Sequence, residues 1–268
     1  IGVGGYASGP TLIMANFLGV PTLIQEQNSF AGVTNKFVAK KAQRICVAYP
    51  NMEQFFPKEK IVMTGNPVRK DILETASKRE QAFKHFGLDP ERKTLLVIGG
   101  SQGAKTINEA IFAGLNDLIS NDLQVIWQTG KLFIDKAKQA VESLQTQRVF
   151  VSDFIYEMDL AYAAADLVVS RAGALSVSEL CLAEKPSILV PLPTAAEDHQ
   201  TQNAMSLVNV KAAWLVKDAK ARDILVDNVI KLADDKFEMQ QLSQNIKTLA
   251  KPNAGKEIAA EVLKIINK

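Results

Sequence analysis

The sequence predicts an α/β protein built on parallel sheets, and two features of the chain lead to this prediction. Short β-branched apolar runs alternate with segments of helical apolar spacing, a pattern typical of parallel strands covered by helices. A strand, a glycine-rich turn and a helix follow one another at residues 1–18 and again at residues 95–118. Because a strand-free segment separates these two series, we expect two domains.

The first domain is expected to span residues 1–65. Pro10 suits the first turn of a helix that runs to Gly19, because its missing N–H costs nothing there. Strands are predicted at residues 21–25, 44–48 and 61–64, with a second helix at 34–41. The chain opens on Ile1 without a methionine, in what looks like the end of a strand. We therefore expect it to begin inside a domain.

The second domain is predicted over residues 66–250. After a helical segment at 72–86, six apolar runs alternate with helices, which predicts a doubly wound parallel sheet. The predicted strands are 94–98, 124–128, 148–151, 167–169, 187–190 and 212–216. The predicted helices lie at 105–118, 133–144, 157–164, from 174 onward, and at 200–208, 224–233, 238–249 and 256–266. Since no strand follows the last helix, residues 251–268 are expected to return to the first domain.

Composition and charge argue against several classes of protein. The 268 residues carry 31 Lys and Arg against 29 Asp and Glu, so the net charge of +2 gives no basic field for nucleic acid despite a basic cluster within residues 36–44. No apolar run reaches the ~18 residues that span a bilayer. Cys46 and Cys181 lack metal or disulfide spacing, which indicates small buried hydrophobes in a reducing compartment. His85 is expected at the surface.

The turn from the strand at 167–169 into the next helix is the main candidate for a ligand site. A helix that starts at Ala174, beyond a strand's carboxyl end, directs unpaired N–H groups into the crevice where open α/β sheets bind ligands. Arg171 could pair with a phosphate, and Glu179 could accept hydrogen bonds from a vicinal diol such as a ribose. The alternative is a solvated Glu179, with Gly173 as a simple turn.

Two further loops offer polar contacts. Residues 99–103, Gly-Gly-Ser-Gln-Gly, lack the spacing of dinucleotide and P-loop motifs, yet the Ser101 hydroxyl could approach a phosphate. The alternative there is a tight turn that needs glycine for packing. Residues 199–203, His-Gln-Thr-Gln-Asn, follow a long polar loop, and an amide such as Gln200 suits sugar hydroxyls. The alternative there is helix capping by Asp198.

Seven stretches resemble the MurG family of bacterial glycosyltransferases, which move N-acetylglucosamine (GlcNAc) from UDP-GlcNAc onto lipid I, a lipid-linked muramyl-pentapeptide. They occur in order over nearly the whole chain, which makes the resemblance specific. The stretches are Gly4-Gly-Tyr-Ala-Ser-Gly-Pro10, Glu26-Gln-Asn28, Gly65-Asn-Pro-Val-Arg69, Gly99-Gly-Ser-Gln-Gly-Ala104, Asp153-Phe-Ile155, Arg171-Ala-Gly-Ala-Leu-Ser-Val-Ser-Glu179 and His199-Gln-Thr-Gln-Asn203.

The resemblance implies the GT-B architecture of two Rossmann-like domains, of which the first is incomplete here. Lipid I is then bound mainly by the first domain and UDP-GlcNAc mainly by the second. The implied reaction is an inverting transfer that forms lipid II in peptidoglycan synthesis and uses neither a cofactor nor a metal. The implied location is peripheral, at the cytoplasmic face of the bacterial inner membrane.

The resemblance also implies individual donor contacts. The Ile155 backbone faces uracil, Glu179 holds the ribose, and Asn28 and Gln200 contact the GlcNAc hydroxyls. Ser101 and the helix start serve the diphosphate, while Arg69 lies near the donor. The implied donor-binding set is Asn28, Arg69, Ser101, Ile155, Arg171, Ala174, Leu175, Ser176, Val177, Ser178, Glu179 and Gln200.

Two departures from the family concern catalysis. Gln25 stands where the family often has histidine, and the family's first glycine-rich loop, with a candidate catalytic histidine, would lie before Ile1. The catalytic base is therefore unknown, and Glu26 is the first residue to test. We expect the chain as given to bind UDP-GlcNAc but to transfer essentially no sugar.

Other functions stay open at this point. A UDP-GlcNAc 2-epimerase shares the architecture and needs no acceptor, so product analysis with UDP-GlcNAc alone separates the two enzymes. A non-catalytic module that binds nucleotide sugars is a further alternative. An NAD-dependent oxidoreductase is disfavoured, because both glycine loops lack the dinucleotide fingerprint spacing.

Overall fold

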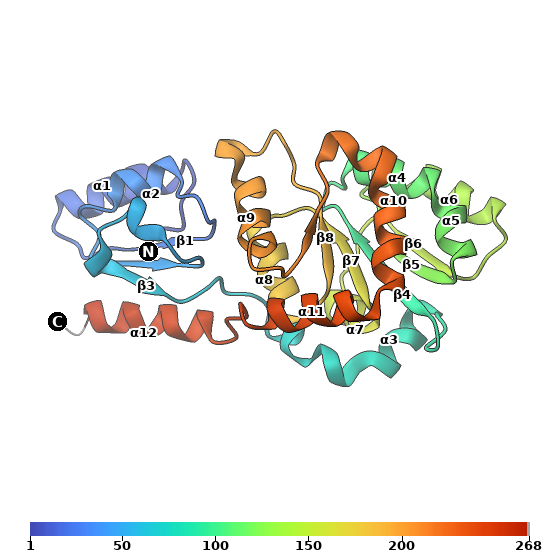
Figure 1. Cartoon of the computed structure of the whole chain (residues 1–268). Coiled ribbons are helices and arrows are strands. Elements are labelled where there is room, and N and C mark those ends of the chain that lie inside the picture. Colours follow the sequence, from blue (N-terminus) through green and yellow to red (C-terminus); the bar gives the residue numbers. More distant parts are fainter. Residues whose placement is uncertain (267–268) are drawn as a thin grey trace.

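The computed structural model describes residues 1–266 and confirms an α/β fold with two parallel sheets (Figure 1). The first sheet has the strand order β1-β2-β3, and Gly2 adds a parallel bridge to Ile24. The strands are β1 (Leu23–Glu26), β2 (Arg44–Val47) and β3 (Ile61–Met63). The helices of this region are α1 (Ser8–Phe17) and α2 (Val33–Val38), with 3-10 turns η1 (Met52–Gln54) and η2 (Lys58–Lys60).

The second sheet confirms the predicted doubly wound arrangement. Its six strands are all parallel, in the order β6-β5-β4-β7-β8-β9. Successive strands are added on one side of β4 up to β6 and on its other side from β7 onward, so the strand order reverses between β4 and β7, the type of position at which open sheets bind ligands. The strands are β4 (Lys93–Ile98), β5 (Leu123–Gln128), β6 (Val149–Ser152), β7 (Leu167–Ser170), β8 (Ser187–Leu189) and β9 (Trp214–Leu215).

Helices cover both faces of this sheet. Leu95 and Val97 of β4 join a buried cluster on one face, while Leu96 and Ile98 join the cluster on the other, as the two-residue period of a strand requires. The helices are η3 (Lys70–Lys78), α3 (Arg79–Phe86), α4 (Lys105–Ala113), α5 (Leu115–Ser120), α6 (Ile134–Ser143), α7 (Met158–Ala164), α8 (Ala174–Leu182), η4 (Ala196–Asp198), α9 (His199–Val208), α10 (Asp218–Asp234), α11 (Lys236–Lys247) and α12 (Ala254–Ile266).

Three helix predictions were wrong in their limits. The helix expected at 105–118 breaks at Gly114, where a Cβ would lie 2.6 Å from Cγ2 of Val226 on α10, so the close approach of α10 favours glycine there. The helix expected at 72–86 is a 3-10 helix up to Lys78. The helix expected from residue 224 begins at Asp218, whose carboxylate is paired with Arg171.

The last helix, α12, lies beside the first sheet (Figure 1). Nε of Arg44 on β2 is 3.3 Å from Oε2 of Glu261 on α12. The chain therefore crosses between the two regions twice, and the crossings meet where Gly65 packs against Lys251. We keep the domain limits 1–65, 66–250 and 251–268 as a proposal.

The two cysteines are buried and His85 is exposed, as the sequence predicted. Burial raises the pKa of the Cys46 thiol to about 11 and that of Cys181 to about 12, which fits two inert apolar side chains. His85 is exposed, as predicted. Among the helices of residues 1–266, none has the length and apolar character needed to cross a membrane.

Candidate active site

The turn from β7 into α8 forms one wall of the candidate site. Gly173 is the extended N-cap residue of α8, and no side chain within residues 1–266 caps it. The first N–H groups of the helix, at Ala174, Leu175 and Ser176, therefore remain available at the carboxyl edge of the sheet. An unpaired helix start of this kind attracts an anion such as a phosphate.

Glu179 lies further along α8 and is partly buried. The hydroxyl of Tyr162 on α7, which is fully buried, donates to Glu179 Oε2 at 3.1 Å. Burial raises the pKa of Glu179 above its ordinary value, while the Tyr162 hydrogen bond and the nearby Arg69 partly oppose this. Within residues 1–266 no hydrogen bond engages Oε1. These contacts argue against a freely solvated Glu179, because one carboxylate oxygen is held by Tyr162 while the other is available to a ligand.

The glycine loop after β4 satisfies both interpretations of its sequence. Gly103 has a φ of +75°, and a Cβ there would collide with the Thr129 carbonyl, so tight packing does require glycine. The Ser101 side chain is nevertheless exposed at the same edge of the sheet. The loop can therefore pack closely and still present a hydroxyl to a phosphate.

Gln128, at the end of β5, joins this loop to the next one. Its Nε2 donates to the Gly100 carbonyl at 3.0 Å, and its Oε1 accepts from the Ile155 N–H at 3.0 Å. Sequence analysis missed Gln128, although a buried glutamine that ends an apolar strand is a usable signal. The Ile155 N–H is engaged by Gln128. The Ile155 carbonyl is therefore the backbone group that remains available to a nucleobase.

Gln200, in the first turn of α9, is oriented from both sides. Its Oε1 accepts from the Leu192 N–H at 3.0 Å and from the Ala172 N–H at 3.3 Å. No acceptor within residues 1–266 takes the Nε2 hydrogens, so Gln200 can donate to a ligand. The capping alternative for this loop was wrong: Asp198 has a left-handed φ of 55°, and its side chain makes no cap hydrogen bond in the described structure.

The chain is similar to relatives of known identity. Residues 94–258 match the glycosyltransferase family 28 C-terminal domain, and residues 1–47 match the N-terminal domain of that family. The UDP-N-acetylglucosamine--N-acetylmuramyl-(pentapeptide) pyrophosphoryl-undecaprenol N-acetylglucosamine transferase of Parabacteroides distasonis is 55% identical over 268 residues, which cover 100% of this chain and 73% of that protein. Acinetobacter baumannii MurG superposes with a TM-score of 0.79 at 30% identity, over 98% of this chain and 73% of that one.

The chain belongs to the MurG family. The GT-B architecture implied by the resemblance is confirmed by the match to A. baumannii MurG. A UDP-N-acetylglucosamine 2-epimerase also superposes, with a TM-score of 0.67 over 98% of this chain and 71% of that one. Its identity is only 13%, so that likeness shows a common fold and does not favour epimerase activity.

The contacts of Arg171 in this MurG-family chain are all made within the protein. It is 9% exposed, and its Nη1 donates to Asp218 on α10 and to the carbonyls of Val190 and Pro191, the latter two at 3.0 and 3.3 Å. These contacts tie the turn before α8 to β8 and α10. They favour a structural role over the predicted phosphate contact. Arg69 is exposed and close enough to Glu179 to influence its pKa.

Glu26 does not have the surroundings of a catalytic base. It is 2% exposed, and its carboxylate accepts from the Asn28 N–H at 3.1 Å, the Gly32 N–H at 3.0 Å and Asn35 Nδ2 at 2.9 Å. A carboxylate held by three donors stabilises the loop after β1 and leaves little room for a substrate proton. The structure therefore argues against the proposal that Glu26 should be tested first as the base.

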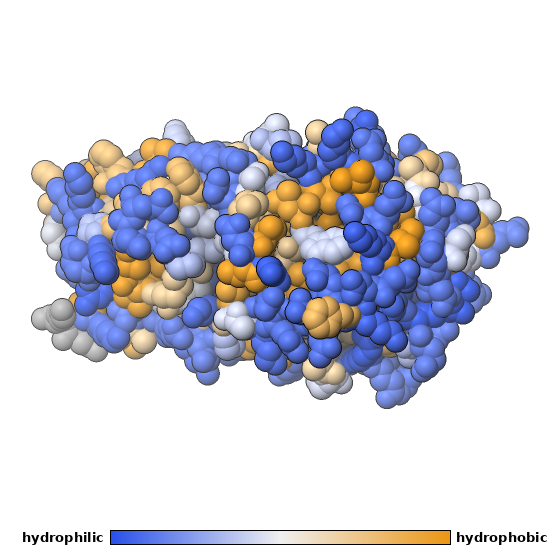
Figure 2. All heavy atoms as spheres, in the orientation of Figure 1, coloured by the Kyte–Doolittle hydropathy of each residue, from blue (hydrophilic) through white to orange (hydrophobic). Residues whose placement is uncertain are grey.

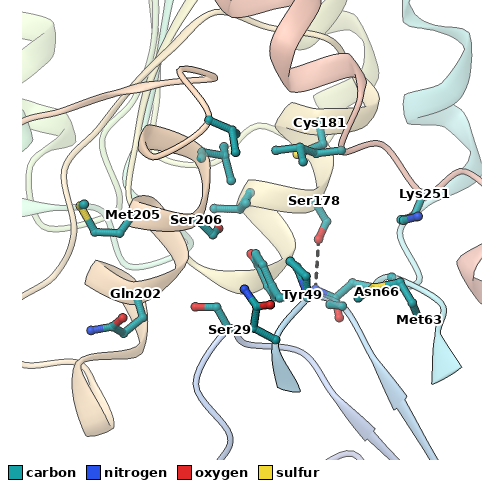
Figure 3. A pocket seen from close by; sticks show the side chains of 18 of the residues that line it. Ser29, Tyr49, Met63, Asn66, Ser178, Cys181, Gln202, Met205, Ser206 and Lys251 are labelled. Carbon is teal, nitrogen blue, oxygen red and sulfur yellow. Dashed lines mark hydrogen bonds between the residues drawn. The ribbon is translucent and has the colours of Figure 1, made fainter. Parts of the chain in front are cut away.

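Two asparagines that sequence analysis left without a role connect the regions. Asn203 on α9 is fully buried; its Nδ2 donates to Asn28 Oδ1 at 3.0 Å, and its Oδ1 accepts from the Ser29 N–H at 2.9 Å. Asn66 Nδ2 donates to Ser178 Oγ on α8 and to the Gln27 carbonyl of the first region, each at 3.0 Å. A cavity of about 540 Å³ lies behind these contacts, with Asn66 and Ser178 in its wall (Figure 3). The predicted sugar contact Asn28 is thus placed by the second region.

Within the described part of the chain, no group of three or more His, Cys, Asp or Glu side chains is placed to hold a metal ion.

Proposed function

We propose that the reaction this chain serves is the transfer of N-acetylglucosamine from UDP-GlcNAc to lipid I, which forms lipid II in peptidoglycan synthesis. That the chain as given binds the donor but transfers essentially no sugar stays a prediction. The observation that carries the proposal is the arrangement at the carboxyl edge of the second sheet. At that edge lie the uncapped start of α8, the half-buried carboxylate of Glu179 and the free amide of Gln200. The chain is also 55% identical to the Parabacteroides distasonis transferase.

The donor contacts follow the free groups of the site. The Ala174–Ser176 N–H groups and the Ser101 hydroxyl bind the diphosphate, because both lie at the helix-start edge of the sheet. Glu179 Oε1 accepts from a ribose hydroxyl, and the Ile155 carbonyl accepts from the uracil N3–H.

The sugar lies between the two regions in this proposal. Gln200 Nε2 donates to one GlcNAc hydroxyl, and Asn28 approaches from the first region. Arg69 adds positive charge near the donor. Val177 and Ser178, also in the implied donor set, line the cavity behind α8, so their side chains face away from the diphosphate.

The proposed reaction is an inverting transfer without a covalent sugar intermediate. A base removes the proton of the acceptor hydroxyl, that oxygen forms a bond to the sugar C1, and the C1–diphosphate bond breaks to release UDP. The α8 N–H groups stabilise the negative charge that develops on the leaving diphosphate. The base is not among the residues assigned here.

We also propose that α1 and α2 contact the surface of the cytoplasmic membrane. Figure 2 shows apolar side chains at the surface of this region. Phe17 is 79% exposed and Phe37 is 71% exposed. Basic side chains within residues 36–44 accompany them, a combination that suits an anionic lipid surface. Flotation of the protein with anionic vesicles should fall in Phe17→Glu; equal flotation would contradict the proposal.

Calorimetry with UDP-GlcNAc, with UDP and UDP-glucose as competitors, tests the donor assignment. We expect UDP to compete and UDP-glucose to compete less well, because it lacks the acetamido group. Absence of UDP binding would contradict the proposal. Incubation with UDP-GlcNAc alone separates the epimerase alternative, since an epimerase yields a second sugar nucleotide without any acceptor.

A further inference from the structure

Asn66 lies where the chain first crosses between the two regions, and its side chain contacts both of them. It follows β3 and is 2% exposed. Its Oδ1 accepts from Gln25 Nε2 at 2.8 Å, and its Nδ2 donates to the Gln27 carbonyl at 3.0 Å. The same Nδ2 donates to Ser178 Oγ on α8 at 3.0 Å, as Figure 3 shows. One buried amide therefore joins β1 and the loop after it to α8.

The chemistry of these partners favours an amide at position 66. The Gln25 Nε2 is a donor, so it needs an acceptor, whereas the Gln27 carbonyl needs a donor. The Ser178 hydroxyl donates to the Ala174 carbonyl at 2.9 Å and so accepts from Asn66. An aspartate would place an acceptor against the Gln27 carbonyl, and an alanine would leave buried partners unsatisfied, which is costly.

The two ends of this connection are the two sides of the candidate site. Ser178 precedes Glu179 on the helix whose start we assign to the diphosphate. Gln25 lies in β1, and Gln27 lies in the loop after it, which presents Asn28. Along the chain, Asn66 and Ser178 are 112 residues apart, so the covalent path offers no short mechanical link. The hydrogen bonds through Asn66 are such a link.

We propose that Asn66 is a positioning residue that couples donor binding at α8 to the ordering of residues 25–29, which are the end of β1 and the loop after it. The inference rests on the proposed function only in that UDP-GlcNAc is the ligand of α8. When the diphosphate holds α8, the Ser178–Asn66–Gln25 contacts fix this loop and bring Asn28 to the sugar. Asn203 holds the same loop from α9, so the loop is fixed on two sides.

Hydrogen exchange measures this coupling directly, because two amides of the loop have identified partners. The Asn28 N–H donates to Glu26 and the Ser29 N–H donates to Asn203. In the unaltered chain we expect UDP-GlcNAc to slow exchange at residues 25–29. In Asn66→Ala that slowing should be lost, while the Kd for UDP stays within about twofold, since the diphosphate and ribose contacts remain. The Kd for UDP-GlcNAc should rise about five- to tenfold, the usual size of a lost hydrogen bond.

A double-mutant cycle separates coupling from simple destabilisation. Ser178→Ala should add nothing to Asn66→Ala if the two side chains act through each other. Asn245→Ala, which removes a surface amide bonded to the Lys211 carbonyl, is the matched control and should behave like the unaltered chain. Additive effects, or normal slowing at residues 25–29 in Asn66→Ala, would overturn the inference. Failure of the unaltered chain to bind UDP-GlcNAc would instead overturn the proposed function, and this inference with it.

Discussion

The two sheets use the polar residues at their carboxyl edges in opposite ways. At the end of β1, Glu26 is 2% exposed, and its carboxylate accepts from the Asn28 and Gly32 N–H groups and from Asn35 Nδ2 on α2. Beyond β7, Glu179 is held through one oxygen by Tyr162 and keeps the other free. Both glutamates lie in motifs of the MurG resemblance, Glu26 at the end of β1 and Glu179 on the helix that follows β7. One supports a loop, while the other has unused capacity for a ligand.

This difference shows that residue type and position do not by themselves identify a binding residue. A polar group at a strand end is a ligand contact only if the fold leaves some of its hydrogen-bonding capacity unused. Gln200 meets that condition, because its carbonyl is engaged and its amide hydrogens are free. Arg171 does not fit it as well, because Asp218 and two carbonyls occupy Nη1.

The largest expected effect is on the stability of the first region. Glu26→Ala removes the acceptor of the partly buried Asn28 and Gly32 N–H groups, each costing about 1–3 kcal/mol, while Asn35 Nδ2 keeps the Gln25 carbonyl. The free energy of unfolding should therefore fall by at least about 2 kcal/mol. Urea unfolding measures this change, with the exposed Glu53→Ala of the same region as control. UDP affinity should change less than about twofold, because the nucleotide contacts lie in the second region. An unchanged stability would contradict the loop-supporting role of Glu26.

The next effect concerns the free carboxylate of the second region. Glu179→Gln should weaken UDP-GlcNAc binding by about 1–3 kcal/mol, the cost of a lost charge-assisted hydrogen bond, without loss of stability. Calorimetry gives the Kd, and Glu142→Gln on the exposed face of α6 is the control. An unchanged Kd would show that the free oxygen of Glu179 does not contact the ligand, so that Glu179, like Glu26, is not a binding residue.

A smaller effect is expected at Gln200, and it depends on the ligand. Gln200→Ala should weaken UDP-GlcNAc binding by about 1 kcal/mol, and UDP binding by less, because the proposed partner is the sugar. Paired titrations with the two ligands measure the difference, with Gln202→Ala as a neighbouring control. Equal losses for UDP and UDP-GlcNAc would assign Gln200 to support of the turn alone.

The smallest expected effect is a shift in pH dependence. Burial raises the pKa of Glu179, so UDP-GlcNAc affinity should be full above that pKa and fall as the pH drops through it. Tyr162→Phe removes a hydrogen bond that lowers the pKa, so the fall in affinity should begin at a higher pH. Calorimetry across a pH series measures the shift. The acid-side fall should disappear in Glu179→Gln, and its persistence there would point to another titrating group.

The sequence by itself determined the element pattern of this protein. Strands and helices could be predicted because apolar periodicity and glycine turns are local properties. The six parallel strands of the second sheet and the helix start at Ala174 followed from that pattern. The motifs near Ser101 and Glu179 were informative for the same reason: each lies within a single strand–turn–helix unit.

Only the tertiary structure decided which polar groups are used up and which remain free. Glu26 is enclosed by its own loop, Arg171 is engaged by α10, and Gln128 and Asn66 join segments far apart in sequence. The break at Gly114 likewise depends on how closely α10 approaches. Hydrogen-bond satisfaction and close packing depend on residues that the fold brings together, so periodicity and spacing along one segment carry no record of them.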